Sequence, residues 1–344
     1  MNDKFLIVGQ GLAGSALSMA LIEEGHHVTV VDDSHKDSAS VVAAGLITTL
    51  AGKGMNPSWR QAEYLETSVE YFRELEETHG VSLLHDLPIY RPFFNQKESA
   101  KFERKRELVK DWVAEDHQVN RCINHPYGGF TMKSGGRLDV LAYLQLVEKL
   151  LGARLHRAQL DLEDKEEFAL KEDAVYWRGE RFDKMILCTG YSGLVDRFFK
   201  SLPSRPAKGE MLDVRIAGLA TTQIISSGGW LVPLGDDLWR AGATYSWDPL
   251  DTLPSEAGRL DVMQKIPRPT TLPFTVESHL VGVRPIVNKS QPVIGMHEEF
   301  PQVGIFNGLG SKGVITSIPV ARHFVEVLMG KKTLDPELDV NRIE

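Results

Sequence analysis

The feature that most constrains this chain is a glycine-rich turn near its N-terminus, between an apolar strand and a helix. The turn reads GQGLAG at 9–14, follows the apolar run 5–8 and precedes an alanine- and leucine-rich stretch over 12–24. A second, β-branched run follows at 28–31. Strand, tight turn, helix and strand in this order predict a βαβ unit in a parallel, doubly wound sheet. We therefore expect an α/β fold.

The glycines of this turn have the spacing of a dinucleotide-binding loop. The first glycine allows the tight turn, the second lets the backbone approach a pyrophosphate, and the third lets helix and strand pack closely. An acidic residue that takes the ribose hydroxyls is expected after the second strand, where two aspartates stand. The motif alone does not distinguish NAD from FAD. The predicted cofactor contacts are Gly9, Gly11, Leu12, Ala13, Gly14, Asp32 and Asp33.

A second glycine-rich turn lies close to the other end of the chain. It spans 308–313, between an apolar run at 303–306 and a long helical stretch that reaches Met329. A continuous nicotinamide-binding domain would be complete much earlier, so a glycine-rich helix start that returns here favours FAD. Lys312 and the helix dipole are placed to stabilise negative charge on a reduced flavin ring. The alternative is a plain glycine N-cap of the last helix.

Composition excludes some classes of protein and disfavours others. The formal net charge is −8, which is unfavourable for a nucleic-acid binder, and the two cysteines match neither a disulfide scaffold nor a zinc site. The longest weakly polar run, 41–52, is too short to span a membrane. The N-terminal segment lacks the cleavage site of a signal peptide. We expect a cytoplasmic protein without metal.

Hydrophobic patterning outlines the rest of the chain. The small residues of 38–60 predict a functional loop that leads into a helix near 43–49, and the polar residues 331–344 predict a tail. Several short strand-like runs within 207–283 indicate an antiparallel sheet. The remaining predicted elements are helices at 57–78, 97–114 and 138–151, strands between 154 and 176, and a buried strand at 184–188.

Taken in order, these segments resemble the D-amino-acid oxidase/glycine oxidase family of FAD-dependent oxidoreductases. The resemblance covers nearly the whole chain. The motifs that carry it are FLIVGQGLAG with Asp32, AAGLI at 43–47, ILCTG at 186–190, KGEML at 208–212, RAGATY at 240–245, VGVRP at 281–285, PVIG at 292–295 and FNGLGSKGV at 306–314.

The resemblance implies a Rossmann-type FAD-binding domain with a parallel sheet, interrupted by a substrate domain with an antiparallel sheet and helices. The FAD domain would comprise 1–80, 135–205 and 285–344, and the substrate domain 81–134 and 206–284. FAD would be bound non-covalently, because no cysteine stands beside either glycine loop in the sequence. Further cofactor contacts implied by the resemblance are Ala43, Ala44, Gly45, Leu46, Leu160, Thr189, Gly190, Gly308, Leu309, Gly310, Ser311, Lys312 and Gly313.

The same resemblance places the substrate site near VGVRP. There Arg284 would pair with a substrate carboxylate, for which a guanidinium offers two parallel hydrogen bonds. Tyr245 and Lys312 are the other candidate catalytic residues, and Trp59 and Arg60 are candidates for the flavin surroundings. The structural alternatives are an arginine that bridges two loops and a half-buried sheet tyrosine.

The expected activity is oxidation of the C–N bond of a small amine or amino acid of the glycine, sarcosine or D-amino-acid type. A hydride would pass to flavin N5 and leave an imine, with oxygen or another acceptor reoxidising the flavin. Two alternatives remain open. The loop GLGSKG is also similar to the oxidase half of a bifunctional enzyme that acts on an N-substituted glycine of a modified tRNA uridine, although the acidic charge and the lack of a methyltransferase half disfavour it. The other alternative is a flavin-binding protein without turnover.

Overall fold

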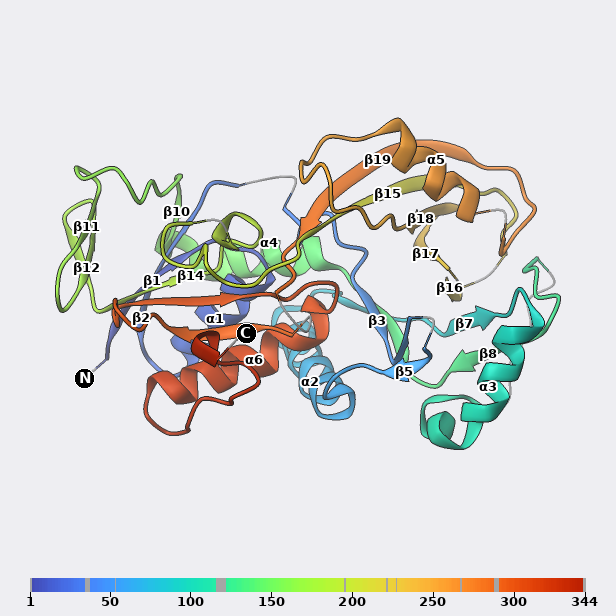
Figure 1. Cartoon of the computed structure of the whole chain (residues 1–344), viewed down its shortest axis with the longest axis horizontal. Helices are drawn as coiled ribbons and strands as arrows, with labels where there is room; N and C mark the ends of the chain where they lie inside the picture. Colours follow the sequence, from blue (N-terminus) through green and yellow to red (C-terminus); the bar gives the residue numbers. More distant parts are fainter. Residues whose placement is uncertain are drawn as a thin grey trace.

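The fold is built on two large sheets, one mainly parallel and one mainly antiparallel, which have no strand in common among the described residues (Figure 1). The computed structural model describes residues 2–34, 38–52, 54–115, 122–194, 196–220, 222–226, 228–266, 268–287 and 291–342. Both sheets were expected from the sequence, and the α/β fold class is confirmed.

The parallel sheet, called sheet A, contains the predicted βαβ unit. Its strands pair in parallel except for the last, which is antiparallel to its neighbour. Within the described residues their order across the sheet is β10 (Leu155–Arg157), β2 (His27–Asp32), β1 (Lys4–Val8), β14 (Lys184–Leu187), β21 (Val303–Asn307) and β20 (Val293–Met296).

Helices cover one face of sheet A, and each has a local reason to begin or end where it does. Helix α1 (Leu12–Glu23) is rich in alanine and leucine, and α2 (Gln61–His79) ends at Gly80 in the left-handed conformation that glycine adopts without strain. Helix α4 (Val140–Leu151) is capped by the Asp139 side chain, which accepts from Ala142 N. Helix α6 (Gly313–Leu328) packs along α1 and α2 (Figure 1).

The antiparallel sheet, called sheet D, extends away from sheet A. Among the strand pairs in the described residues of this sheet, only β16–β7 is parallel. Helix α5 (Glu256–Lys265) lies over β15 and β18, and α3 (Gln96–Val109) lies beside β7 and β8 (Figure 1). The described strands of sheet D are, in order, β19 (Thr275–Arg284), β15 (Ala207–Arg215), β18 (Leu238–Gly242), β17 (Trp230–Gly235), β16 (Ile224–Ser226), β7 (Ile89–Pro92) and β8 (Gly129–Met132).

Three smaller sheets complete the described structure. The hairpin sheet β11–β12–β13 covers the face of sheet A opposite the helices, where Trp177 and Phe182 are buried against Phe198. The other strands are β11 (Phe168–Leu170), β12 (Val175–Trp177), β13 (Glu180–Phe182), β3 (Leu46–Thr48), β9 (Gly135–Leu138), β6 (Leu84–Asp86), β4 (Leu50–Ala51) and β5 (Asn56–Pro57). None of the helices in the described ranges is long and apolar enough to cross a membrane.

Two expectations about local structure are wrong. The helix expected near 43–49 is an irregular loop followed by β3, which pairs with β9. Gly45 lies there at a φ of 69°, and a Cβ on it would lie 1.9 Å from Leu138 O, so the backbone at this point cannot follow a helix. The β-branched side chains that follow favour a strand.

The polar C-terminal segment is also not a free tail. Leu338 and Val340 are buried, and Asp339 forms a parallel bridge with Ile294 of β20. Two apolar residues among polar ones are enough to dock the segment against sheet A. The division into FAD and substrate domains stays a prediction, because β3–β9–β6 joins strands from both sets of ranges.

Candidate active site

A cavity of about 1020 Å³ runs between the carboxyl ends of the sheet A strands and the inner strands of sheet D. This volume is at the upper end for a small-molecule site. Its walls include both glycine-rich turns, although these are separated by nearly the whole chain. In open α/β sheets ligands bind at this edge, beyond the carboxyl ends of the strands.

The first glycine turn fits a close approach of backbone to ligand. Gly9 lies at a φ of 99°, and a Cβ on it would meet Cys188 O at 2.6 Å. A Cβ on Gly14 would lie only 1.8 Å from Gly9 O, so this glycine is required for the turn and α1 to pack together. Helix α1 begins at the cavity with Gly11 as its N-cap. Leu12 N donates to Ser40 Oγ at 3.1 Å, and the positive end of the helix dipole faces the cavity, where it favours a phosphate.

Asp32 ends β2 and is held by three donors. Its carboxylate accepts from Gln10 N at 2.7 Å, from Ser34 N at 2.8 Å and from Arg157 Nη1 at 2.9 Å. Arg157 is directly opposite Asp32 in the parallel β10–β2 pairing, and it also contacts Glu148 at 2.7 Å. These contacts fix the carboxylate at the wall of the cavity. Arg157 was not predicted, because its place follows only from the strand register.

The second glycine turn closes the other end of the cavity. Gly308 and Gly310 adopt φ values of 75° and 53°, which glycine tolerates without strain. Gly313 begins α6, and a Cβ on it would meet Leu12 at 2.9 Å, so the two turns pack against each other. Lys312 Nζ donates to Thr48 Oγ1 at 2.9 Å, and burial lowers the pKa of Lys312 to about 8.

Arg284, the last residue of β19, presents its guanidinium to the cavity. A Cβ on Gly209 of β15 would lie at 2.3–2.5 Å from Cζ and both terminal nitrogens, so the flat side of the guanidinium lies on this glycine. The Cζ atom is 4.8 Å from the ring centroid of Tyr245, and Nη1 donates to Thr244 O at 3.3 Å. Burial lowers the pKa of Arg284, which nevertheless stays protonated.

No carboxylate among the described residues pairs with Arg284. A half-buried guanidinium without an internal anion is unfavourable unless a ligand supplies the charge. The edge of the group remains available, because its flat side rests on Gly209. The arrangement therefore suits a bidentate carboxylate.

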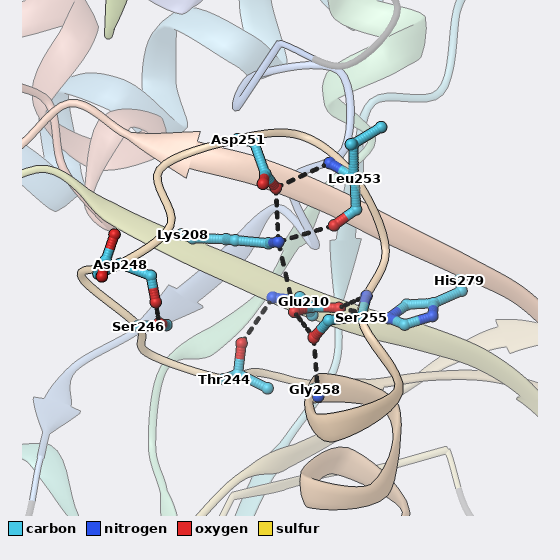
Figure 2. Close-up of polar contacts among 10 residues, drawn as sticks. All are labelled: Lys208, Glu210, Thr244, Ser246, Asp248, Asp251, Leu253, Ser255, Gly258 and His279. Carbon is cyan, nitrogen blue, oxygen red and sulfur yellow. Dashed lines mark hydrogen bonds and ion pairs between the residues drawn. The ribbon is translucent and has the colours of Figure 1, made fainter.

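The loop between β18 and α5 forms part of the cavity wall through residues 250–253. Figure 2 shows the contacts that hold it. Lys208, buried in β15, donates from Nζ to Asp251 Oδ1 and to Leu253 O, both at 2.7 Å. The carboxylate of Glu210, two residues along, accepts from Ser255 N at 2.9 Å and from Ser255 Oγ at 2.6 Å (Figure 2). Two buried charges thus fasten one wall of the cavity to the sheet.

A further contact ties sheet D to the loop that was expected to line the flavin. Arg240 pairs with Asp213 at 2.7 Å through Nε, and its Nη1 lies 3.5 Å from Val42 O and 3.4 Å from Ala43 O. A Cβ on Gly282 would meet Val42 at 2.7 Å, so the loop crosses directly over β19. The RAGATY motif was recognisable in the sequence, but this role of its arginine was not predicted.

Comparison with known proteins shows which family the chain belongs to. The family described as FAD dependent oxidoreductase, DAO, matches residues 4–327. The chain belongs to this family. The DAO match covers both glycine turns, both large sheets and the cavity between them, and it confirms the predicted FAD-dependent oxidoreductase and its cofactor.

The chain is similar to a tRNA 5-methylaminomethyl-2-thiouridine biosynthesis bifunctional protein, MnmC, of Caulobacter vibrioides. The two are 26% identical over 343 residues, which are 95% of this chain and 54% of that protein. The chain thus spans about half the length of this curated relative.

Three solved structures have the DAO fold at less than 20% identity. Glycine oxidase from Geobacillus kaustophilus has a TM-score of 0.80 at 18% identity, covering 96% of each chain. Iminodiacetate oxidase from Chelativorans sp. BNC1 has a TM-score of 0.77 at 19% identity, covering 97% of each. L-α-Glycerophosphate oxidase from Mycoplasma pneumoniae, with FAD bound, has a TM-score of 0.77 at 16% identity, covering 99% of this chain and 98% of that one.

Most residues predicted to contact FAD do line the cavity of this DAO protein. This arrangement of residues fits an extended dinucleotide. Each individual contact stays a prediction. The predicted residues that form its walls are Gly9, Gly11, Leu12, Ala13, Asp32, Asp33, Ala43, Ala44, Gly45, Leu46, Leu160, Thr189, Gly190, Leu309, Gly310, Ser311, Gly313 and Arg284.

Other predicted residues lie outside the cavity lining. Gly14 and Gly308 shape the backbone behind it, and the Lys312 amine reaches Thr48. Trp59 and Arg60 instead contact Glu337 of the C-terminal segment, at 3.3 and 2.8 Å.

Cys188, although distant in sequence, lies beside the first glycine turn in the folded chain, contrary to the expectation that no cysteine does. Cys188 lines the cavity at the end of β14, and its Cβ would lie 3.3 Å from a Cβ on Gly14. Sequence distance concealed this, because β14 pairs directly with β1. Burial raises the pKa of Cys188, which keeps it a neutral thiol. Non-covalent binding of FAD stays a prediction.

Proposed function

We propose that the chain oxidises the C–N bond of a small amine or amino acid that carries a carboxylate. The observation that supports this most is Arg284, whose guanidinium faces the cavity without a carboxylate partner among the described residues. The structural neighbours named glycine oxidase and iminodiacetate oxidase add support, since their named substrates carry both a carboxylate and an amine.

In this proposal the residues act mainly by positioning. Arg284 holds the carboxylate, and the wall formed by 250–253 restricts water and the approach of the rest of the substrate. Bound FAD would supply the hydride acceptor for oxidation of the carbon next to nitrogen, and the resulting imine would hydrolyse. Correct placement of the reacting atoms can supply a large part of the rate without a strong base. The charge of Lys312 would favour electron-rich states near the second glycine turn.

The test is anaerobic reduction of the bound flavin by a panel of glycine, sarcosine, D-amino acids, L-proline and iminodiacetate. We expect at least one carboxylate-bearing amine to bleach the flavin, and the corresponding amine without a carboxylate to do so far more weakly. Arg284→Ala should weaken binding of that substrate by roughly 2–5 kcal/mol while FAD remains bound. If the whole panel leaves the flavin oxidised, the proposed substrate class is wrong.

A second candidate is favoured by the similarity to the Caulobacter vibrioides tRNA-modifying protein. In that case the amine would be an N-substituted glycine attached to a modified uridine of tRNA. Flavin bleaching by tRNA that carries the modification, and none by unmodified tRNA, would support this candidate over a free amino acid. The net charge of −8 remains unfavourable for binding tRNA.

A further inference from the structure

Four side chains form a continuous ladder that leads outward from the candidate substrate site. Arg284, at the cavity, has its Cζ 4.8 Å from the ring centroid of Tyr245. The Tyr245 ring lies 5.6 Å from the ring of Trp247, at an interplanar angle of 60°. Arg205 closes the ladder, with its Cζ 4.5 Å from the Trp247 ring. Two adjacent aromatic rings therefore lie between two guanidinium groups.

The two rings of this ladder are exposed yet held in place. Tyr245 and Trp247 keep 49% and 48% of their surface accessible. They flank Ser246, whose backbone exchanges hydrogen bonds of 2.8 and 3.0 Å with Lys208 of β15. The Ser246 side chain also donates to Asp248 O (Figure 2). The backbone that carries the two rings is thus fixed by strand-like pairing. Binding of a ligand to them therefore costs the protein little conformational entropy.

The backbone of the outer arginine is equally constrained. Arg205 N donates to Ile286 O at 2.8 Å, beside an antiparallel bridge between Ser204 and Val287. No carboxylate among the described residues pairs with Arg205. Its guanidinium is therefore kept at the Trp247 ring rather than diverted to an acid.

The ladder is continuous with the cavity, which indicates what it binds. Arg284 belongs to both, and a carboxylate at its edge directs the remainder of a ligand either into the cavity or outward past Tyr245. Leu253, 69% exposed, lines the cavity as well and adds an apolar surface to the wall. The spacings of 4.8 and 5.6 Å place the rings within reach of a substituent only a few bonds from the carboxylate.

We propose that this ladder is a subsite for a flat aromatic ring on the substituent of the substrate. The reaction of such a substrate rests on the proposed function, but its binding does not. Stacking on an aromatic ring gives about 0.5–1.5 kcal/mol beyond what buried area alone provides. A saturated ring of the same size gains only the free energy of buried apolar area. A preference for the flat ring therefore distinguishes this subsite from a general apolar surface.

The experiment compares unreactive carboxylates by calorimetry on the FAD-loaded protein. The probes are 4-phenylbutanoate and 4-cyclohexylbutanoate, which match N-benzylglycine and its saturated counterpart with a methylene in place of the amine, and butanoate as the ring-free reference. We expect 4-phenylbutanoate to bind about 5-fold more tightly than 4-cyclohexylbutanoate. Equal dissociation constants for the two ring compounds in the wild-type protein would overturn the proposal without any variant.

Substitutions at Trp247 then locate the preference. Trp247→Ala should reduce the ratio between the two ring compounds to less than 2-fold, whereas Trp247→Phe should keep most of it. Butanoate should bind all three proteins alike, which shows that the Arg284 site is intact. A phenyl preference that survives in Trp247→Ala places the ring elsewhere and also overturns the proposal.

Flavin reduction by N-benzylglycine, sarcosine and glycine separates this inference from the proposed reaction. If none of them reduces the flavin while the phenyl preference holds, the reaction is wrong and the ring subsite stands. If sarcosine reduces the flavin but no ring preference exists, the reaction stands and the ladder is not part of the substrate site.

Discussion

At the residue scale, the orientation of Arg284 depends on the absence of a side chain at Gly209. Gly209→Ala would place a methyl group within 2.5 Å of the guanidinium, which is the far end of a flexible side chain and can move away. We expect the fold to tolerate the change, with the unfolding free energy altered by less than about 1 kcal/mol. Carboxylate binding should weaken roughly 10-fold, because the guanidinium edge is displaced.

Calorimetry with butanoate and a thermal melt on the same preparation measure the two effects of Gly209→Ala. Arg284→Ala serves as the control for complete loss of the carboxylate contact. Unchanged butanoate affinity in Gly209→Ala would show that carboxylate binding does not depend on the contact between the Arg284 guanidinium and residue 209.

The buried amine of Lys312 should make the stability of the fold depend on pH. Its pKa is lowered from 10.5 to about 8 by burial in the fold. Between these values the unfolded chain keeps a proton that the folded chain has released, so stability rises with pH across this window. Below about pH 8 both states are protonated, and the cost of burying the charge, about 3 kcal/mol at most, applies in full. Lys312→Met should therefore stabilise the FAD-free protein at pH 7.

Urea unfolding of the FAD-free protein at pH 7 and pH 10.5 tests this sign. The advantage of Lys312→Met over the wild type should shrink towards zero at the higher pH. Lys331→Met, which removes an exposed lysine paired with Glu24, should show neither the gain nor its pH dependence. A difference that is constant with pH would mean that the Lys312 amine is not desolvated.

At the element scale, the position of the loop between β18 and α5 should depend on Lys208. Lys208→Met removes two hydrogen bonds of 2.7 Å to this loop and takes away the ammonium group that lies 3.8 Å from the buried Glu210 carboxylate. We expect a loss of roughly 2–4 kcal/mol in unfolding free energy. The cavity wall should also loosen, so substrate affinity should fall more than the maximal rate.

Urea denaturation and steady-state kinetics give these two quantities for Lys208→Met. The pair of Lys331 with Glu24 again offers the comparison, because both partners are about half exposed and should contribute less than 1 kcal/mol. Equal losses of unfolding free energy in the two lysine variants would contradict the inference that buried Lys208 holds this loop to sheet D.

The elements of this chain differ in how far the sequence reveals them. The βαβ unit, helix α4 and β21 were predicted, because hydrophobic period and glycine position agree locally, whereas helix α5 was not expected within 207–283. The helix expected at 43–49 failed because Gly45 adopts a conformation set by its contact with Leu138, far away in sequence. The C-terminal segment was misjudged because Leu338 and Val340 are too few to form a visible pattern.

At the scale of the whole molecule, Arg240 links sheet D to the loop over which FAD is expected to lie. Arg240→Met would remove the ion pair with Asp213 and the contacts to Val42 O and Ala43 O. We expect FAD affinity to fall about 10-fold, because the loop loses its outer support. Titration of the FAD-free protein with FAD, followed by flavin fluorescence, measures this.

Arg215→Met is the matched control, since Arg215 also pairs with an acid of sheet D, Glu277, but at the exposed end of the sheet. Its FAD affinity should equal that of the wild type. Equal losses in the two variants would attribute the effect to sheet D in general rather than to the loop contact.

The site as a whole was only partly predictable from the sequence. The glycine turns carry a chemical signature within a few residues, whereas Arg284 was assigned through the resemblance of VGVRP to the family motif. Arg157, Arg240 and Lys208 act through partners that strand register brings beside them, and no local pattern marks those pairings. The position of Cys188 beside the first glycine turn follows from the same cause.

The strand order of sheet A has a consequence for synthesis of the chain. Strand β14 pairs with β1 on one side and with β21 on the other, but β21 begins only at Val303. At about 5–20 residues per second, the ribosome needs roughly 6–23 s to add residues 188–302. For that interval the growing chain presents an open, apolar strand edge, and strands β15 to β19 of sheet D are made during it. Translation speed through this region thus governs how long a nascent molecule is exposed to pairing with its neighbours on the same messenger RNA.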